Sequence, residues 1–424
     1  SESQHHGLKE CFPVATMLTW KNKRRVVLGI TGGIAAYKGP EILRALQRAG
    51  CEVEVVLTEG AESFVSPMVL STLAGRRTWT QDDFLSQEKG WEIPHINLAD
   101  WAELVIIAPC TAETLARLVQ GRGESLLDAT VLATKAPVLL FPAMNSHMLE
   151  HPATVRNIKE ARAMSYTVVD PDEGSLACGY EGKGRLPAPS VIVEEAWRAL
   201  SPRKDFAGVS VLVTAGPTWE FIDPVRFISN PSSGKMGFAL ARTAWYRGAD
   251  VTLVSGPVSL PTPHGITYCP VKSAMDMYKA VIEKMDFAKI IIKSAAVSDY
   301  RAASIETEKM KREGKDTLTL NLVQNPDIAA EVGARKSPDQ ILVGFAAESS
   351  HLVEHAKEKM LRKNLDLIVA NDITATDAGF AVDTNRVKII KKAGDWHELV
   401  GTKEEVAWGV LNTVSEMCQK EENR

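Results

Sequence analysis

The sequence has no long apolar run, no closely spaced cysteines and no large excess of charge of one sign. No apolar run approaches the roughly 18 residues that span a bilayer. The formal net charge of −4 over 424 residues gives no basic footprint for nucleic acid or for a membrane surface. The six cysteines are scattered without C-x-x-C spacing, so neither a disulfide framework nor a zinc motif is indicated. We expect a cytoplasmic protein that binds neither nucleic acid nor membranes.

The composition is that of a globular protein, with 45% hydrophobic and 24% charged residues. A chain of 424 residues is too long for one ordinary core. Periodicity breaks at Ser201-Pro-Arg-Lys-Asp205, which marks a boundary. We predict a disordered extension over 1–20, a first domain over 21–200 and a second over 207–424.

Both halves open with the same order of elements. Each begins with an apolar strand, from Val26 or from Val209, followed by a glycine turn and a helix. The next parallel strands are Cys51–Leu57 and Asp250–Ser255. This alternation predicts an α/β protein with two doubly wound, Rossmann-like domains and mainly parallel sheets. Ligands of such sheets bind beyond the carboxyl ends of the strands.

The segment from Val209 to Gly237 runs from a strand through a polar loop into a helix. Ser232-Ser-Gly-Lys235 precedes an amphipathic run, so backbone amides at a helix N-terminus are available to an anion. The loop carries Asp223, Arg226 and Asn230, and long polar loops in compact α/β domains are usually functional. A connection that binds no phosphate is the alternative.

Two nucleotide-binding motifs are excluded in this segment. Met236 follows Gly234-Lys235 where a P-loop has serine or threonine, and Ser229 stands in place of its first glycine. Gly216 is not followed by the glycines of a dinucleotide fingerprint, which excludes an ordinary nicotinamide-dependent dehydrogenase.

Two further segments contain candidate functional groups. His95 precedes a helical stretch predicted around Ala99 to Leu104 and is a candidate base, with a structural histidine as the alternative. Cys178 lies in the glycine-rich segment Gly174–Arg185, which cannot be a helix or strand for long. We predict a mobile flap there, with an ordinary loop as the alternative.

Lysines of the second half are candidates for anion binding. Lys309 belongs to a charged run that is either a solvated face or a triphosphate contact. Lys359 and Lys363 have helical i,i+4 spacing, so both can reach one anion from one face of a helix.

Several of these motifs resemble one enzyme family. Six segments resemble the phosphopantothenate–cysteine ligase domain: Thr214-Ala-Gly-Pro-Thr218, Ile222-Asp-Pro-Val-Arg226, Ile228-Ser-Asn230, Ser232-Ser-Gly-Lys-Met-Gly237, Ala295-Ala-Val-Ser-Asp-Tyr-Arg301 and Asn371-Asp372. Four others resemble the flavin-dependent cysteine decarboxylase domain: Gly29-Ile-Thr-Gly-Gly-Ile-Ala-Ala-Tyr-Lys38, Pro94-His-Ile96, Pro142-Ala-Met-Asn145 and Ala177-Cys-Gly179. Together they resemble the bifunctional decarboxylase–ligase family of bacterial coenzyme A biosynthesis.

For the second domain, the resemblance implies a ligase that uses CTP and Mg²⁺. CTP would activate 4′-phosphopantothenate as an acyl-cytidylate, and the amine of L-cysteine would displace CMP. Asn230 would assist turnover of the acyl-cytidylate, and Lys309 would meet the triphosphate. The implied CTP site comprises Ala295, Asp299, Asn325, Pro326, Asp327, Ile328, Phe345, Lys359 and Lys363. No metal ligands are assigned.

For the first domain, the resemblance implies FMN-dependent decarboxylation of 4′-phosphopantothenoylcysteine to 4′-phosphopantetheine. Gly32, Gly33 and Thr111 match positions near the flavin. The implied catalytic residues are His95 as a base or orienting group, Asn145 at the substrate carboxylate, and Cys178 as a proton donor.

Other expectations concern substrate contacts and assembly. Arg185 and Arg226 are candidates for substrate binding. The resemblance further implies a ligase dimer and a decarboxylase trimer, hence a homo-oligomer of twelve chains with the flavin at a subunit interface. The alternative function is a flavin-binding regulatory module fused to an inactive nucleotide-binding domain.

Overall fold

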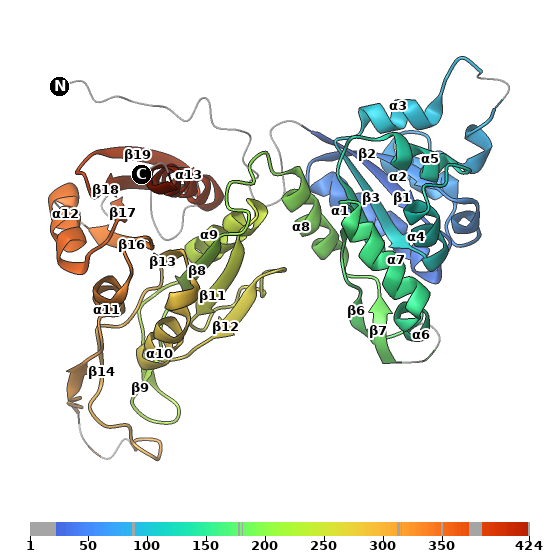
Figure 1. Cartoon of the computed structure of the whole chain (residues 1–424). Helices are drawn as coiled ribbons and strands as arrows, with labels where there is room; N and C mark the ends of the chain where they lie inside the picture. The colour runs from blue at the N-terminus through green and yellow to red at the C-terminus, as the bar shows by residue number, and fades with distance from the viewer. Residues whose placement is uncertain are drawn as a thin grey trace. The chain divides into compact units, whose positions relative to one another are not determined.

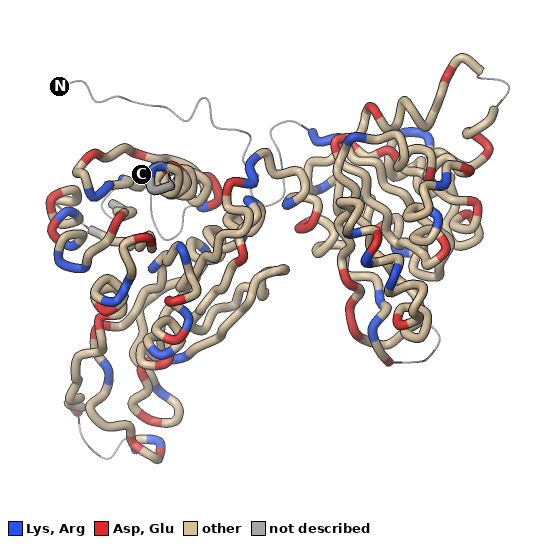
Figure 2. Tube along the Cα trace, viewed as in Figure 1, with Lys and Arg blue, Asp and Glu red and all other residues tan. Residues whose placement is uncertain are grey.

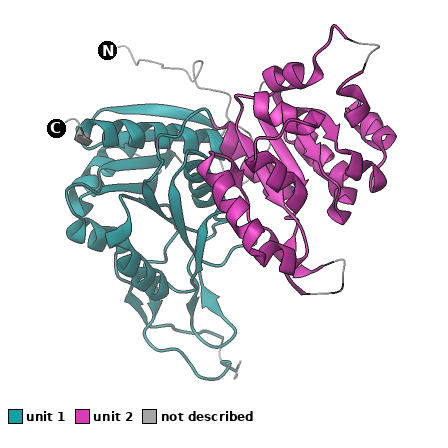
Figure 3. Cartoon of the chain, turned by 45° about the vertical axis from the view of Figure 1, so that its right-hand side comes forward, with its two compact units in different colours: residues 1–16, 202–424 teal, residues 17–201 magenta. Residues whose placement is uncertain are grey.

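The computed structural model describes residues 23–86, 90–176, 179, 181–311, 314, 316–348, 351–372 and 384–422. They form two compact units that divide between Ser201 and Pro202 (Figure 3). In the order of the chain, we call the unit before this boundary the first unit (magenta in Figure 3) and the unit after it the second unit (teal). Each unit has a mainly parallel sheet covered by helices on both faces, which confirms the predicted fold class. Acidic and basic residues are interspersed along both units (Figure 2). In the part of the chain that the structure describes, no helix is long and apolar enough to cross a membrane.

The sheet of the first unit has five parallel strands in the order β2-β1-β3-β4-β5. The strands are β1 (Arg24–Ile30), β2 (Cys51–Leu57), β3 (Leu104–Cys110), β4 (Val138–Pro142) and β5 (Thr167–Val168). Every residue of β3 is buried, as expected of a central strand covered on both faces. The strand order reverses between β1 and β3, so the switch point of this sheet lies where those two strands end.

The helical segments of this unit surround the sheet (Figure 1). They are η2 (Ile34–Lys38), α1 (Gly39–Arg48), η3 (Glu59–Ser63), α2 (Pro67–Ala74), η4 (Gln81–Asp83), α3 (Pro94–Trp101), α4 (Ala112–Val119), α5 (Leu126–Ala133), α6 (Ser146–Glu150), α7 (Pro152–Ala163) and α8 (Pro189–Leu200). The helix predicted around Ala99 to Leu104 was misplaced. It begins at Pro94, whose fixed φ suits the first helical position, and Leu104 already belongs to β3.

The glycine-rich segment also differs from its prediction. It contributes to an antiparallel hairpin of β6 (Asp172–Ser175) and β7 (Glu181–Arg185). Gly184 has a φ of 142° and lies so close to the chain that a Cβ would come 2.0 Å from the Met144 carbonyl oxygen. Glycine therefore serves here to bring a strand against the main chain, in addition to making the segment irregular.

The sheet of the second unit has eight strands in the order β12-β11-β8-β13-β16-β17-β18-β19. Six are parallel, namely β8 (Ser210–Ala215), β11 (Asp250–Ser255), β12 (Thr267–Pro270), β13 (Ile290–Lys293), β16 (Ile341–Glu348) and β17 (Leu367–Asp372). The strands β18 (Thr384–Lys391) and β19 (Trp396–Thr402) extend it in antiparallel fashion. The order reverses between β8 and β13, which places the switch point there.

Helices cover both faces of this sheet. One face packs against α9 (Lys235–Tyr246) and α13 (Lys403–Glu422). The other packs against α10 (Ala274–Lys284), η6 (Met285–Phe287), α11 (Ile328–Arg335) and α12 (Leu352–Lys363). Two small hairpins, β9 (Glu220–Phe221) with β10 (Phe227–Ile228) and β14 (Tyr300–Ala302) with β15 (Leu322–Gln324), lie beyond the sheet (Figure 1).

Candidate functional site

The loops after β8 and β13 are joined at the switch point of the second unit. The hydroxyl of Thr214 accepts a hydrogen bond from the amide of Ala295 at 3.2 Å. Further along, the amide of Ala296 donates to the Gly216 carbonyl at 2.9 Å, and the amide of Ser298 donates to the Thr218 hydroxyl at 3.0 Å. The motif that begins at Thr214 and the motif that begins at Ala295 therefore form one continuous surface.

Two further predicted segments reach this surface. The Asn230 side chain donates from Nδ2 to the Val297 carbonyl at 3.2 Å. The side chain of Asn325 donates to the Ser298 carbonyl at 2.8 Å, and the backbone amide of Asn325 donates to the Asp299 carbonyl at 2.8 Å. Asn230, Ala295, Asp299 and the Asn325–Ile328 segment are thus brought together, although they lie far apart in the sequence.

Positive charge comes from the C-terminal half of α12. Lys359 and Lys363 line a pocket of about 300 Å³ together with His355, Glu358 and Arg362. Lys363 also forms an ion pair of 2.9 Å with Asp327, which caps α11. Burial opposes ionisation of Asp327, but the hydrogen bond from Lys363 and the α11 amide hold the pKa of this carboxyl below its ordinary value. Phe345 is half-buried in β16.

Asp223 fastens the segment that carries Lys309. Its carboxylate accepts hydrogen bonds from the amides of Val225, Arg226 and Met310 at 2.8, 2.7 and 3.2 Å. The guanidinium of Arg226 donates to Asp223 at 2.9 Å and also to the Met310 carbonyl. Although burial opposes it, these donors lower the pKa of Asp223 to about 2. Arg226, predicted as a substrate ligand, is thus engaged within the chain, whereas Lys309 is exposed.

Gly32, Gly33 and Thr111 meet at the switch point of the first unit. The Thr31 hydroxyl donates to the Pro109 carbonyl at 2.7 Å and accepts from the Thr111 amide at 3.0 Å. A Cβ at Gly33 would lie 3.5 Å from Cγ2 of Thr111. The Thr111 hydroxyl caps α4 by accepting from the Thr114 amide at 3.2 Å.

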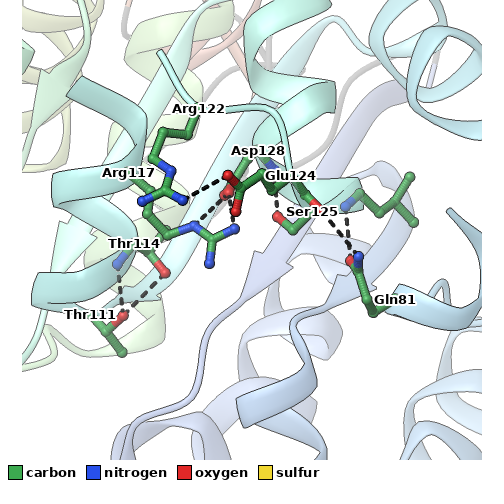
Figure 4. A network of polar contacts seen from close by, with 9 residues as sticks. Gln81, Thr111, Thr114, Arg117, Arg122, Glu124, Ser125 and Asp128 are labelled. Atoms are coloured by element: carbon green, nitrogen blue, oxygen red, sulfur yellow. Dashed lines mark hydrogen bonds and ion pairs between the residues drawn. The ribbon is translucent and has the colours of Figure 1, made fainter. Parts of the chain in front are cut away.

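A polar network holds α4 in this position (Figure 4). Arg117 of α4 donates to the buried carboxylate of Asp128 in α5 at 2.7 Å. Gln81 of η4 accepts from the Leu126 amide at 3.0 Å, which ties the start of α5 to the segment after β2. The helix that Thr111 caps is therefore fixed at both its N-cap and its second turn.

The segment after β4 packs against the β6–β7 hairpin. The Met144 amide donates to the Gly184 carbonyl at 3.0 Å, and the Asn145 side chain caps α6 by accepting from the His147 amide at 2.9 Å. Cys178 follows β6 and precedes β7 in sequence but lies outside the described residues.

Lys38 is a charged residue that the sequence-based prediction missed. Burial and the nearby charge of Arg185 lower the pKa of Lys38, so two cations lie close together beside the glycine turn. Its only signal in the sequence was its position as the last residue of the motif that begins at Gly29 and contains Gly32.

His95 lies elsewhere in the unit. Its ring packs edge-on against the ring of Phe84, with the two ring centroids 5.4 Å apart. Its Nδ1 is buried, with no hydrogen-bond partner among the residues described. Figure 1 shows α3 at one end of the unit and the β6–β7 hairpin with α6 at the other. A single chain therefore does not bring His95 to Asn145.

Comparison with known proteins covers both units. Residues 206–417 match the family model of the DNA/pantothenate metabolism flavoprotein C-terminal domain, and residues 15–201 match the flavoprotein model. The coenzyme A biosynthesis bifunctional protein CoaBC of Bacillus subtilis (strain 168) is 44% identical over 403 residues, which cover 94% of this chain and 98% of that protein. The chain belongs to this family.

Other relatives agree in name. The protein of the same name from Escherichia coli (strain K12) is 45% identical over 374 residues, covering 88% of this chain and 92% of that protein. A crystal structure of the C-terminal domain of a CoaBC protein is 39% identical with a TM-score of 0.45, covering 51% of this chain and 99% of that one. The chain is a bifunctional enzyme of coenzyme A biosynthesis with decarboxylase and ligase activities, and it includes a flavoprotein domain. The regulatory alternative is not favoured.

Proposed function

We propose that the unit over 202–424 performs the ligation and the unit over 17–201 the decarboxylation. The ligase unit joins 4′-phosphopantothenate to L-cysteine through an acyl-cytidylate and consumes CTP. The decarboxylase unit converts 4′-phosphopantothenoylcysteine to 4′-phosphopantetheine. The observation that carries this proposal is the convergence of Asn230, Ala295 and the Asn325–Ile328 segment at a switch point next to the lysines of α12.

In the ligase unit, each group has a defined task. Lys359 and Lys363 bind phosphate oxygens of CTP in the pocket of α12. Asn230 holds the acyl-cytidylate carbonyl as negative charge develops on its oxygen. Lys309 approaches the triphosphate, and the Asp223–Arg226 pair holds the backbone of the Lys309 segment at Met310.

The residues of the first unit fit FMN. The glycine turn at Gly32 and Gly33, the N-terminus of α4 at Thr111 and the cation of Lys38 suit a flat cofactor with a phosphate group. Bound FMN supplies the two-electron redox chemistry of the reaction. Asn145 binds the substrate carboxylate, His95 accepts or orients a proton, Cys178 returns a proton, and Arg185 contacts substrate.

Assembly follows from the separation of these groups. Because His95 and Asn145 lie at opposite ends of the unit, a second copy of the chain supplies one of them to each flavin site. We therefore propose a homo-oligomer of twelve chains, built from dimers of the ligase unit and trimers of the decarboxylase unit, in the cytoplasm.

A magnesium ion accompanies the triphosphate in this proposal. In the described part of the chain, no three His, Cys, Asp or Glu side chains are grouped to hold a metal. Mg²⁺ that accompanies a nucleotide is usually held largely by phosphate oxygens and water, with one or two protein carboxylates.

The direct test is to incubate the purified protein with 4′-phosphopantothenate, L-cysteine, CTP and Mg²⁺ and to follow the products by mass spectrometry. We expect 4′-phosphopantetheine together with CMP. Accumulation of 4′-phosphopantothenoylcysteine would contradict the role of the first unit, and absence of CMP would contradict that of the second.

A further inference from the structure

Lys293 is a buried amine at the switch point of the ligase unit. It is the last residue of β13, and the residue is only 8% exposed. Its Nζ lies 3.5 Å from the Thr214 hydroxyl, which also accepts from the Ala295 amide. The amine therefore lies directly beneath the two joined loops. Its burial was not predictable from the sequence, because a lysine at the end of a strand is ordinarily exposed.

Two charged groups dominate the surroundings of this amine. Asp327 at the start of α11 favours the ammonium form, and Lys363 at the end of α12 opposes it. Burial has the largest effect and lowers the pKa of Lys293 to about 7. Lys359 acts on Asp327 from the same helix as Lys363, and His355 lines the pocket with both lysines.

A purely structural role explains this residue poorly. Ile290, Ile291 and Ile292 show that aliphatic side chains fill the rest of β13. Within the described residues, the hydrogen-bond partner of Lys293 is one hydroxyl at the limit of bonding distance, and no carboxylate contacts it directly. Burial without a paired carboxylate disfavours the charged form.

We propose that Lys293 takes up a proton when a nucleoside triphosphate binds beside Thr214 and the Asp327–Lys363 pair, and that the buried ammonium so formed strengthens the complex. The proton comes from the buffer and is released again when the nucleotide leaves. The inference rests on the proposed function, since it requires the triphosphate in the pocket of α12.

The physical reason is electrostatic. The triphosphate brings several negative charges toward Lys359 and Lys363, which compensate the repulsion between Lys363 and Lys293 and favour the ammonium form. By linkage, an affinity that depends on one such proton is about tenfold weaker at pH 8 than at pH 6. Lys293 is a positioning residue in this scheme, because it acts through Thr214 and the local charge.

Calorimetry measures the proton directly. The full-length protein is titrated with CTP and Mg²⁺ at pH 7.5 in two buffers of different ionisation enthalpy, and the difference in heat gives the protons taken up. The variants are Lys293→Met, which keeps an unbranched apolar side chain, and His355→Gln as the matched control for the histidine of the same pocket. The ionisation of CTP itself is common to all three proteins.

We expect net proton uptake on CTP binding in the wild type and in His355→Gln, and none in Lys293→Met. The dissociation constant of Lys293→Met for CTP should also depend less on pH. Equal uptake in Lys293→Met and wild type would overturn the proposal, as would its loss in His355→Gln alone. If Lys293→Met does not fold, zero uptake by the wild type overturns it independently. Absence of any CTP binding by the wild type would contradict the proposed function as well, which distinguishes the two failures.

Discussion

At the scale of single residues, Lys293 also predicts how stability depends on pH. Its pKa falls from the ordinary 10.5 to about 7, so the unfolded chain binds more protons than the folded chain between these values. Stability therefore rises with pH across this interval. Below pH 7 the full cost of burying the amine of Lys293 is present, about 5 kcal/mol at most. We expect Lys293→Met to raise the free energy of unfolding of its unit near pH 7, with a gain that shrinks as the pH approaches 10.

Urea denaturation between pH 6.5 and 9.5 checks this expectation. The matched control is Lys279→Met, since Lys279 is exposed on α10 and its replacement should change stability little at any pH. A gain of the same size at both ends of the pH range would show that packing, and not the titration of Lys293, determines the effect.

Asn230 makes a second prediction at this scale. Its amide donates to the Val297 carbonyl, and a carboxylate would repel both that oxygen and the developing charge of the acyl-cytidylate. We expect Asn230→Asp to form the acyl-cytidylate but to consume it about 100-fold or more slowly, as when one donor to a developing oxyanion is lost. Rapid quenching and chromatography of the nucleotide products would detect it. Ser229→Ala, next to it in the chain, should turn over normally.

At the scale of elements, the Asp223–Arg226 pair connects the β9–β10 hairpin with the segment of Lys309. In Asp223→Asn, one side-chain NH₂ group would face backbone amides that also donate, so at least one of the present hydrogen bonds is lost. We expect faster hydrogen exchange at Met310 and at least tenfold slower CMP formation, with decarboxylation of added 4′-phosphopantothenoylcysteine unchanged. Glu331→Gln is the control, because it removes an exposed ion pair with Arg335. Normal ligase turnover in Asp223→Asn would exclude a role for the Asp223–Arg226 pair in the ligation.

The elements also show what the sequence could and could not predict. The strands Cys51–Leu57 and Asp250–Ser255 have the predicted bounds because valines and leucines alternate with polar residues in them, which is the periodicity of a β-strand. The β6–β7 hairpin was not predicted, since its pairing depends on the contact of Gly184 with Met144 and not on strand propensity. The helix start at Pro94 was likewise missed.

The candidate site was predictable to the extent that its residues belong to recognisable motifs. Asn230, Ala295 and Asn325 are joined as their motifs suggested. The position of Lys293 and the internal pairing of Arg226 depend on burial and on contacts between distant segments, which local patterns do not contain. Sequence patterns thus identified the residues of the motifs better than the contacts that hold these residues in place.

At the scale of the whole molecule, the first unit presents an apolar surface around η2 and α2. Ile34, Tyr37, Phe64, Met68 and Val69 are each at least 43% exposed. Large exposed apolar side chains commonly mark an interface between proteins when they form one patch. This agrees with our proposal that the flavin sites are completed between copies of the chain.

Mixing two inactive variants tests this directly. His95→Gln and Asn145→Asp should each lose decarboxylation when pure, but subunit exchange should restore it, because random mixing leaves about one site in four with an intact His95 from one chain and an intact Asn145 from another. The control mixes Asn145→Asp with Gly184→Ala, whose Cβ would collide with the Met144 carbonyl on the same side of the site. That mixture should stay inactive, since neither variant can supply an intact Asn145 side of the site. If subunit exchange is verified but the mixture of His95→Gln with Asn145→Asp regains no decarboxylation, His95 and Asn145 act within one chain.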